Sequence, residues 1–241
     1  MSNIQKLNNI DHANIKINTD YSADLGDSKM FCPAFPNEMR ALQSCYPLVF
    51  YKDPQTGSFH PIALFGFEEN ENLYLDENGW NGAYIPIMVQ RGPLMIAAEG
   101  AQGSEEQQRV VAIDMAHPKV SRESGQALFL ELGGNSDFLE RAATMLEAIH
   151  IGHQQSISFV EALLALDLIA PIALKITLKT GAQHELSGFY GLDDEKLQTL
   201  SGDILTGLQA QGHLLPAFMM LASQSQLQSL IARKNARLAA Q

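Results

Sequence analysis

The segment YPLVFYKDPQTGSFHPIALFGF, residues 46–67, decides the fold class of this 241-residue chain. Two apolar and aromatic runs, 46–51 and 59–67, flank the sequence Lys52-Asp-Pro-Gln-Thr-Gly57. Asp-Pro followed by Gly is typical of a turn, because proline fixes φ early in the turn and glycine accepts left-handed backbone. The pattern predicts an antiparallel β-hairpin whose strands lie within these two runs.

Short strand-like runs continue on the C-terminal side of this hairpin. They lie at residues 73–75, 84–89, 94–98, 110–114 and 127–132. Pro86 and Pro93 restrict two of them to edge, bulged or bent positions, because proline cannot donate to the hydrogen-bond ladder. Short strands separated by turns favour antiparallel pairing over β-α-β units. We therefore predict an α+β fold with a mainly antiparallel sheet in a β-rich region, residues 45–132.

Helical periodicity dominates residues 136–241, which we predict to hold helices plus a β-hairpin. A first apolar helix face is formed by residues three and four apart, namely Phe138, Ala142, Met145, Leu146 and Ile149. We expect Gly152 to end this helix, and a second helix to follow over 156–167 with Ser158 and Glu161 as its capping box. The remaining predicted elements are strands over 173–178 and 185–192 with a turn at 179–182, a helix from Asp193 to Gly212, and a last helix bearing Leu221, Leu227, Leu230, Ile231 and Leu238.

Composition and charge limit the classes of function. The content of 46% hydrophobic and 18% charged residues is that of a globular protein. We predict a flexible N-terminal arm over 1–28 and a single domain over 29–241. The formal net charge of -11 would repel a polyanion, so nucleic acid is not an expected partner. The sequence does not indicate an oligomeric state.

The sequence predicts neither a signal peptide nor a membrane-spanning helix. The segment Met1–Lys29 is polar and lacks the apolar core of a signal peptide. The longest apolar tract, Ala162–Leu174, contains Asp167 and Pro171 and is too short to cross a bilayer, which takes about 20 apolar residues. We therefore expect a cytoplasmic protein without membrane insertion.

Three ordered groups of motifs resemble the SapC family over residues 37–237. The first group holds Tyr46–Phe50, Thr56–Phe59, Ala63–Phe67 and Glu71–Tyr74; the second holds Trp80–Pro86 and Arg91–Leu94; the third holds Leu186–Leu197, Gly212–Leu214 and Arg233–Asn235. The chain departs from the family at Gly92–Met95, where members usually carry a bulkier, Phe-containing run. If these residues line a site, its shape differs here.

The resemblance implies a bacterial, accessory role. The family name comes from a link to bacterial surface-array (S-layer) proteins. Members are similar to proteins encoded beside outer-membrane nutrient receptors, flavin-dependent halogenases and cupin-like oxygenases. The resemblance brings no catalytic residues to transfer to this chain.

The best binding candidate from the sequence is the segment from Trp80 to Arg91. Trp80, Tyr84 and Arg91 combine apolar bodies with polar tips, a mixture that is enriched at recognition hot spots. Nearby prolines would hold this segment extended, and an extended edge can accept a peptide strand. The alternative interpretation is a bent strand whose aromatic side chains fill the core.

The best metal-binding candidate is the triplet Glu147, His150 and His153. On a continuing helix, side chains three residues apart are neighbours, and Glu-x-x-His is a pairing found in carboxylate-bridged metal sites. Against this, a helix end at Gly152 would turn His153 away, and a histidine near a helix C-terminus is favourable for dipole reasons alone. Asp114 and His117 form a weaker acid–base pair, with a polar strand end as the alternative.

We predict no cofactor and no catalytic residues, because no nucleophile elbow and no phosphate-binding loop is found. The sequence therefore favours a non-enzymatic binding or accessory protein with a protein or peptide partner. The alternatives are a metal-dependent enzyme using Glu147, His150 and His153, and a secretion-linked surface protein, which the family name suggests and the polar N-terminus opposes.

Overall fold

The computed structural model describes residues 2–99, 108–172, 174–177, 183–186 and 188–240. In this part of the chain, helices combine with strands that pair only antiparallel, so the predicted α+β class is confirmed. Tertiary contacts divide the chain into two compact units. Unit 1 holds residues 1–27 and 87–151, and unit 2 holds 28–86 and 152–241. These bounds differ from the predicted division at residue 28.

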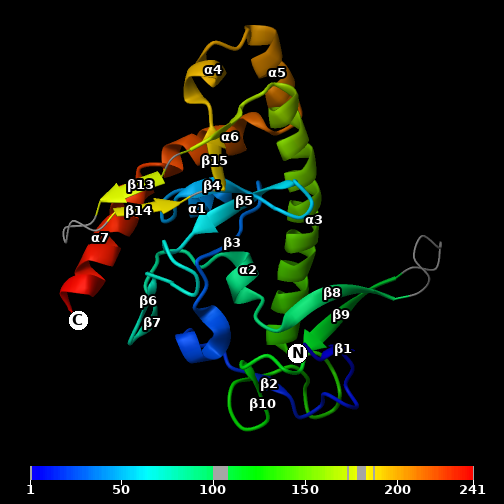
Figure 1. Ribbon diagram of the computed structural model, residues 1–241. Helices are drawn as coiled ribbons and strands as arrows, with labels where there is room; N and C mark the ends of the chain where they lie inside the picture. Colours follow the sequence, from blue (N-terminus) through cyan, green and yellow to red (C-terminus); the bar gives the residue numbers. More distant parts are fainter. Residues whose placement is uncertain (1, 100–107, 173, 178–182, 187, 241) are drawn as a thin grey trace. The chain divides into compact units, whose positions relative to one another are not determined.

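Unit 1 contains two small antiparallel sheets and the first half of a long helix (Figure 1). Their strand orders are β1-β9-β8 and β10-β2-β11. The elements are β1 Ile4–Lys6, β2 Lys16–Ile17, the π-helix η1 Ala23–Asp27, α2 Ile87–Gln90, β8 Leu94–Glu99, β9 Gln108–Asp114, β10 Val120–Ser121, β11 Gln126–Ala127, and α3 Asp137–Ala165, of which 137–151 belong to unit 1.

The N-terminal residues are part of unit 1 rather than an arm beside it. β1 pairs with β9 from Ile4 opposite Asp114 to Lys6 opposite Ala112. Ile15 and Ile17 are buried in a core completed by Leu94, Ile113, Leu128, Leu139, Ala142 and Leu146. The predicted loose arm differs from the structure because two isolated isoleucines among polar residues give no periodic pattern that would signal burial.

Two of the strand predictions in unit 1 are confirmed. The runs at 94–98 and 110–114 correspond to β8 and β9. The run at 84–89 is not a strand, because Ile87–Gln90 forms α2; the residue before it is Pro86, and a proline is tolerated where a helix begins. Of the run at 127–132, only Ala127 lies in a strand, β11.

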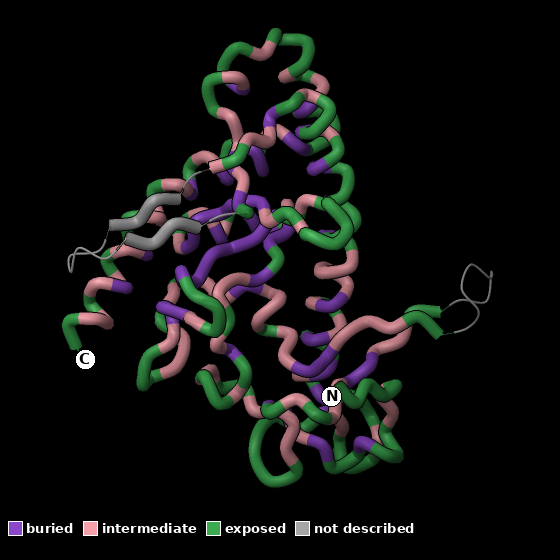
Figure 2. The backbone as a smooth tube through the Cα atoms, viewed as in Figure 1, coloured by how far each residue is buried: buried purple, intermediate pink, exposed green. Residues whose placement is uncertain are grey.

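Unit 2 is built on a five-stranded antiparallel sheet of order β12-β15-β4-β5-β3. The predicted hairpin is confirmed at its centre, where Leu48 of β4 lies opposite Ala63 of β5 and Lys52 opposite Phe59. Gly57 takes φ 73°, as its place in the turn requires. Figure 2 shows buried backbone concentrated in β4 and β5. The strands of unit 2 are β3 Phe31–Pro33, β4 Leu48–Lys52, β5 Phe59–Leu64, β6 Leu75–Asp76, β7 Gly79–Trp80, β12 Ile169–Pro171, β13 Leu174–Thr177, β14 Gln183–Leu186 and β15 Phe189–Leu192.

The predicted hairpin in the C-terminal half is partly confirmed. β13 and β14 pair antiparallel with Leu174 opposite Leu186, while the second run continues as β15 in the central sheet. The turn predicted at 179–182 lies outside the described residues. The run at 73–75 contributes only Leu75 to a strand, β6, which pairs with β7.

Each of the two last predicted helices is divided in two. The helices of unit 2 are α1 Met39–Leu42, residues 152–165 of α3, α4 Asp194–Gln198, α5 Gly202–Ala210, α6 Leu214–Ser223 and α7 Gln226–Ala239. Ser201 is extended (φ -66°, ψ 155°) and separates α4 from α5. Gly212 (φ 76°) follows the end of α5, as predicted. Between α6 and α7, Gln224 Nε2 donates to the carbonyl of Leu48 at 2.8 Å. The break between the two helices therefore contacts the first residue of β4.

α3 is one continuous helix, so the predicted helix end at Gly152 is wrong. A Cβ at Gly152 would lie 2.7 Å from the Cβ of Phe35. Glycine is therefore needed for close packing of α3 and not for helix termination. Ser158, the predicted N-cap, lies inside α3 and donates to the carbonyl of Gln155 at 3.1 Å. The helix ends at Ala165, before Asp167 takes left-handed backbone (φ 53°).

Candidate functional site

Trp80 and Tyr84 meet in unit 2 around the buried hydroxyl of Tyr46. Trp80 Nε1 donates to Tyr46 Oη at 2.9 Å, and this hydroxyl donates in turn to the carbonyl of Tyr84. Tyr84 Oη donates to Glu38 Oε2 at 3.1 Å. Burial, and then the charge of Glu38, raise the pKa of Tyr84 above its ordinary value. The polar tips of both side chains are thus engaged inside the unit, and a partner role for them stays a prediction.

Arg91, the third residue of the predicted binding segment, belongs to unit 1. Its Nη1 donates to the carbonyl of Leu94 at 2.9 Å. Burial lowers the pKa of the guanidinium. The predicted trio is therefore divided between the two units, because the chain passes from unit 2 to unit 1 after Pro86.

Glu147, His150 and His153 all lie on α3, which continues through Gly152. Glu147 Oε1 accepts from Arg109 Nη1 at 3.1 Å across unit 1. His153 belongs to unit 2, where it lines a groove. Within the part of the chain that the structure describes, no three His, Cys, Asp or Glu side chains are grouped to hold a metal ion. The metal-dependent enzyme stays a prediction without a supporting observation.

The side chains of Asp114 and His117 bond different backbone amides, and the amide of His117 donates to the carbonyl of Asp114 at 3.1 Å. Asp114 Oδ1 accepts from the backbone amides of Asn3 at 2.7 Å and Ala116 at 3.0 Å, and these bonds lower the pKa of the carboxyl. His117 Nδ1 accepts from the amide of Lys119 at 3.1 Å. This arrangement is typical of a polar strand end.

An apolar site lies in unit 2 between α3 and the β4–β5 hairpin. We call it the α3–hairpin groove. Its cavity volume is about 490 Å³, and it is lined by Gly57, Ser58, Phe59, His60, His153, Ser156, Ile157, Val160, Glu161 and Leu164. The α3 residues among them recur at three- and four-residue spacing, which places them on one face of the helix.

Two features make the α3–hairpin groove suitable for a ligand. Ile157 and Leu164 are 51% and 44% exposed, although both are large and apolar. Phe59 and His60 pair with β4 but lie beyond β3, whose pairing with β5 covers only Ile62–Leu64. An apolar groove with a few polar groups beside an open strand edge is a common setting for ligand and peptide binding.

The sequence did not predict the α3–hairpin groove, although it singled out His153. The wall formed by 57–60 and the wall formed by α3 are separated by about a hundred residues of chain, so no local pattern joins them. The signal available in the sequence was the presence of two large apolar side chains, Ile157 and Leu164, on the polar face of this helix.

The cationic C-terminal helix also has contacts that its sequence does not reveal. Lys234 Nζ is buried and lies 2.6 Å from Glu71 Oε1 and 2.8 Å from Glu68 Oε1. Arg237 donates to the carbonyls of Asn72 and Leu75, and the guanidinium of Arg233 lies 4.4 Å from the ring centre of Tyr74. α7 therefore fastens the segment 68–75 within unit 2.

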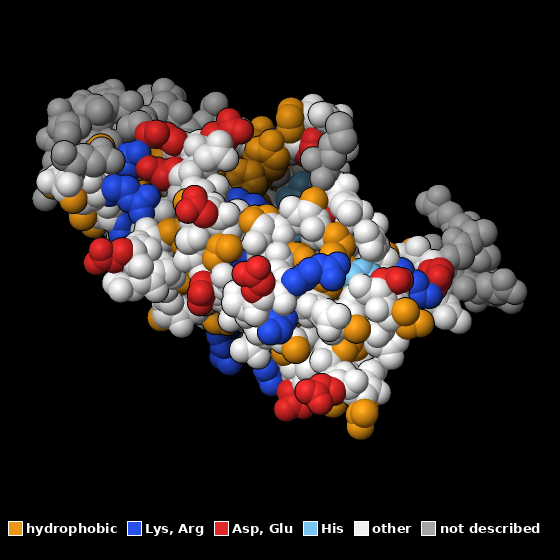
Figure 3. Space-filling model, turned by 90° about the horizontal axis from the view of Figure 1, so that it is seen from below, with side chains coloured by type: hydrophobic (Ala, Val, Ile, Leu, Met, Phe, Trp, Pro, Cys, Tyr) orange, Lys and Arg blue, Asp and Glu red, His pale blue; other side chains and the backbone are white. Residues whose placement is uncertain are grey.

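Charges of both signs are mixed on the visible surface. On the face drawn in Figure 3, Asp and Glu side chains are interspersed among Lys and Arg. The expectation that nucleic acid is not a partner stays a prediction.

Comparison with known proteins gives one family. A family model described as SapC matches residues 7–230, which is most of the 241-residue chain. No curated protein and no solved structure matches. Among the described residues, none of the helices combines the length and apolar character needed to cross a membrane.

Proposed function

The chain belongs to the SapC family, and we propose that it is a non-enzymatic binding protein whose α3–hairpin groove takes an extended peptide segment of a partner protein. One observation carries this proposal. The exposed apolar side chains of Ile157 and Leu164 share a cavity of about 490 Å³ with Phe59 and His60, which form an open strand edge.

The two apolar residues supply anchoring energy. Fully burying a Leu or Ile side chain contributes about 1.5–3 kcal/mol. Because Ile157 and Leu164 are only about half exposed, covering each contributes roughly 1 kcal/mol. Phe59 and the buried Val160 add further apolar surface to the groove. A partner segment with apolar side chains at alternate positions would present one row to these anchors.

The polar groups define the rest of the partner. The backbone N–H and C=O of Phe59 can extend the sheet by one strand, because β3 does not cover them. Glu161 lines the same groove and makes no ion pair with a described residue. We therefore propose a Lys or Arg in the peptide opposite Glu161. As the family resemblance implies, such binding would serve a bacterial surface, nutrient-uptake or modification system in an accessory role.

Peptide-display selection against the purified chain tests this proposal. We expect enrichment of short extended sequences with alternating apolar residues and a Lys or Arg. Binding of an enriched peptide, measured by fluorescence anisotropy, should weaken at least tenfold, about 1.4 kcal/mol, in Ile157→Asp and Leu164→Asp.

The matched control is Leu132→Asp, which introduces the same charge at a side chain that is 101% exposed in unit 1. This variant should bind like the wild type. Enriched peptides that bind Ile157→Asp and wild type equally would count against the groove. A selection without any enriched pattern would count against peptide binding altogether.

A further inference from the structure

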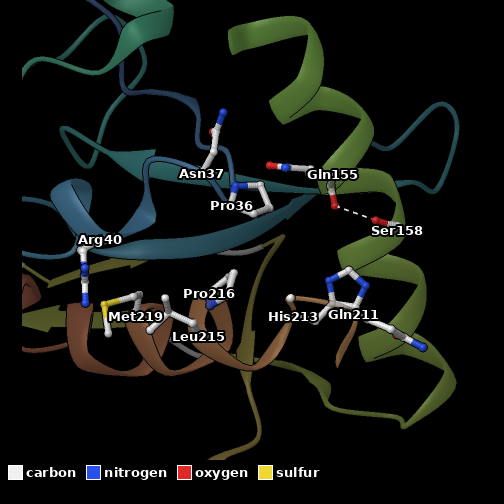
Figure 4. A pocket seen from close by; sticks show the side chains of 11 residues that line it. Pro36, Asn37, Arg40, Gln155, Ser158, Gln211, His213, Leu215, Pro216 and Met219 are labelled. Atoms are coloured by element: carbon white, nitrogen blue, oxygen red, sulfur yellow. Dashed lines mark hydrogen bonds between the residues drawn. The ribbon is translucent and has the colours of Figure 1, made fainter. Parts of the chain in front are cut away.

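A second cavity of unit 2, of about 350 Å³, lies between α1, α3 and α6 (Figure 4). We call it the Arg40–His213 cavity. It is lined by Pro36, Asn37, Arg40, Gln155, Ser158, Gln211, Gly212, His213, Leu215, Pro216 and Met219. Gln155 and Ser158 lie about 100–180° round α3 from His153, Ile157 and Leu164 of the α3–hairpin groove. The two sites are therefore independent.

His213 is buried without a hydrogen bond from its ring. The residue is only 8% exposed, and its imidazole packs 5.9 Å from the ring centre of Phe159. Its ring nitrogens make no hydrogen bond to a described residue, and the residue lines the cavity. Figure 4 shows the ring between α6 and α3, beside the side chains of Gln155 and Ser158. The ring therefore presents a donor and an acceptor with which a ligand in the cavity can form hydrogen bonds.

Desolvation adds a constraint on this partner. Burial lowers the pKa of His213 from its ordinary 6.5. At neutral pH the imidazole is therefore uncharged, with one nitrogen as donor and the other as acceptor. His213 also precedes α6, whose first turn has no side-chain cap, so unsatisfied backbone N–H groups favour negative charge or an acceptor at this end.

Arg40 supplies a positive charge at the other end of the cavity. Figure 4 shows its side chain extending from α1 toward α6, near Met219, with Pro36 and Pro216 between it and His213. Arg40 makes no ion pair with a described residue. No Asp or Glu lines the cavity. A guanidinium matches a carboxylate or phosphate with two parallel hydrogen bonds.

We propose that the Arg40–His213 cavity binds a small organic anion, with its carboxylate or phosphate on Arg40, an apolar body along Pro36, Pro216 and Met219, and a hydroxyl or carbonyl on His213. This role goes beyond peptide binding in the α3–hairpin groove. It assigns the chain a small-molecule ligand, which would bind in the same unit as the peptide.

Nuclear magnetic resonance of the His213 ring, assigned with His213→Asn, tests the proposal. The probes are 4-hydroxybenzoate, 4-hydroxyphenyl phosphate, acetate and inorganic phosphate, with neutral 4-hydroxybenzyl alcohol and sodium chloride as controls. We expect saturable shifts with at least one of the two aromatic anions, and tighter binding than that of its simple anion. The carboxylate and phosphate arms show which head group the cavity prefers.

Variants distinguish a built site from general charge attraction. Arg40→Gln should weaken binding of the preferred anion at least tenfold, and Arg40→Lys should retain part of it. Arg141→Gln removes the same charge from the exposed surface of unit 1 and should bind normally. The proposal is overturned if none of the four anions shifts the His213 signal at millimolar concentration. Equal binding by Arg40→Gln and Arg141→Gln would overturn it as well.

Discussion

Gly152 and Phe35 pack so closely that a Cβ at position 152 would lie 2.7 Å from the Cβ of Phe35. This contact sets the distance between α3 and the segment that leads into α1. Asn37 and Arg40 on that segment, and Gln155 and Ser158 on α3, line the Arg40–His213 cavity. The absence of a Cβ at Gly152 therefore affects the shape of the cavity as well as the packing of the core.

Gly152→Ala should destabilise unit 2 by about 1–3 kcal/mol, because overpacking outweighs the helix propensity gained. Thermal unfolding followed by circular dichroism measures the change. The control is Gly207→Ala in α5, where a Cβ meets nothing within 4 Å; it should be stabilising by up to about 1 kcal/mol. If both variants gain stability, the close approach of α3 to Phe35 is not as described.

Local signals predicted the hairpin and failed at these long-range contacts. Pro54 and Gly57 mark the turn within a dozen residues of both strands, so β4 and β5 could be predicted from the sequence. Gly152 reads as a helix end in isolation, because its reason, Phe35, is distant in the chain. Ser223 and Gln224 likewise lie where α6 ends, and both bond Leu48, about 175 residues away.

The candidate sites were less predictable for the same reason. His153 was identified from its spacing to Glu147 and His150, but its neighbours in the groove come from the β4–β5 hairpin. No pattern in the sequence singled out His213, because only the structure shows that its ring lines a cavity. Trp80 and Tyr84 were candidates for binding a partner, and in the structure their polar atoms bond within unit 2.

Lys234→Met should lower the free energy of unfolding by about 3 kcal/mol, because it leaves the carboxylate of Glu71, whose side chain is 11% exposed, without its cation. Urea unfolding measures the loss. Lys6→Met is the matched control, since its ion pair with Glu99 is exposed and worth under about 1 kcal/mol. Equal effects in the two variants would show that the buried pair does not stabilise unit 2.

The same lysine predicts an alkaline dependence. Burial opposes its charge, but the hydrogen bonds to Glu68 and Glu71 outweigh this and raise the pKa of Lys234 above 10.5. The folded chain therefore holds this proton more tightly than the unfolded chain does. Its stabilising contribution is complete below pH 10.5 and is lost as the pH rises through the raised pKa. Lys234→Met should show a smaller alkaline loss than the wild type.

His213 predicts a dependence of the opposite sign at acid pH. Burial lowers its pKa below 6.5, so the unfolded chain takes up the proton more readily. Stability from the neutral ring is present above about pH 6.5 and is lost as the pH falls. Thermal unfolding at several pH values should show less acid loss in His213→Gln; an identical loss would contradict the assignment.

Trp80→Phe should destabilise unit 2 by about 1–2 kcal/mol, through loss of the bond to Tyr46 and of packing volume. Unfolding by urea measures this cost. Binding of a peptide selected against the α3–hairpin groove should not change. A variant that folds normally but loses the peptide would move the binding site to Trp80 and Tyr84.

Hydrogen–deuterium exchange with and without a selected peptide tests the α3–hairpin groove most directly. We expect slower exchange of the amides in residues 57–60 and 153–164 on binding, because the peptide covers both walls and extends β5. Leu132→Asp should keep this protection, and Ile157→Asp should lose it. Protection confined to other segments, such as 80–91, would contradict the claim that the peptide binds in this groove.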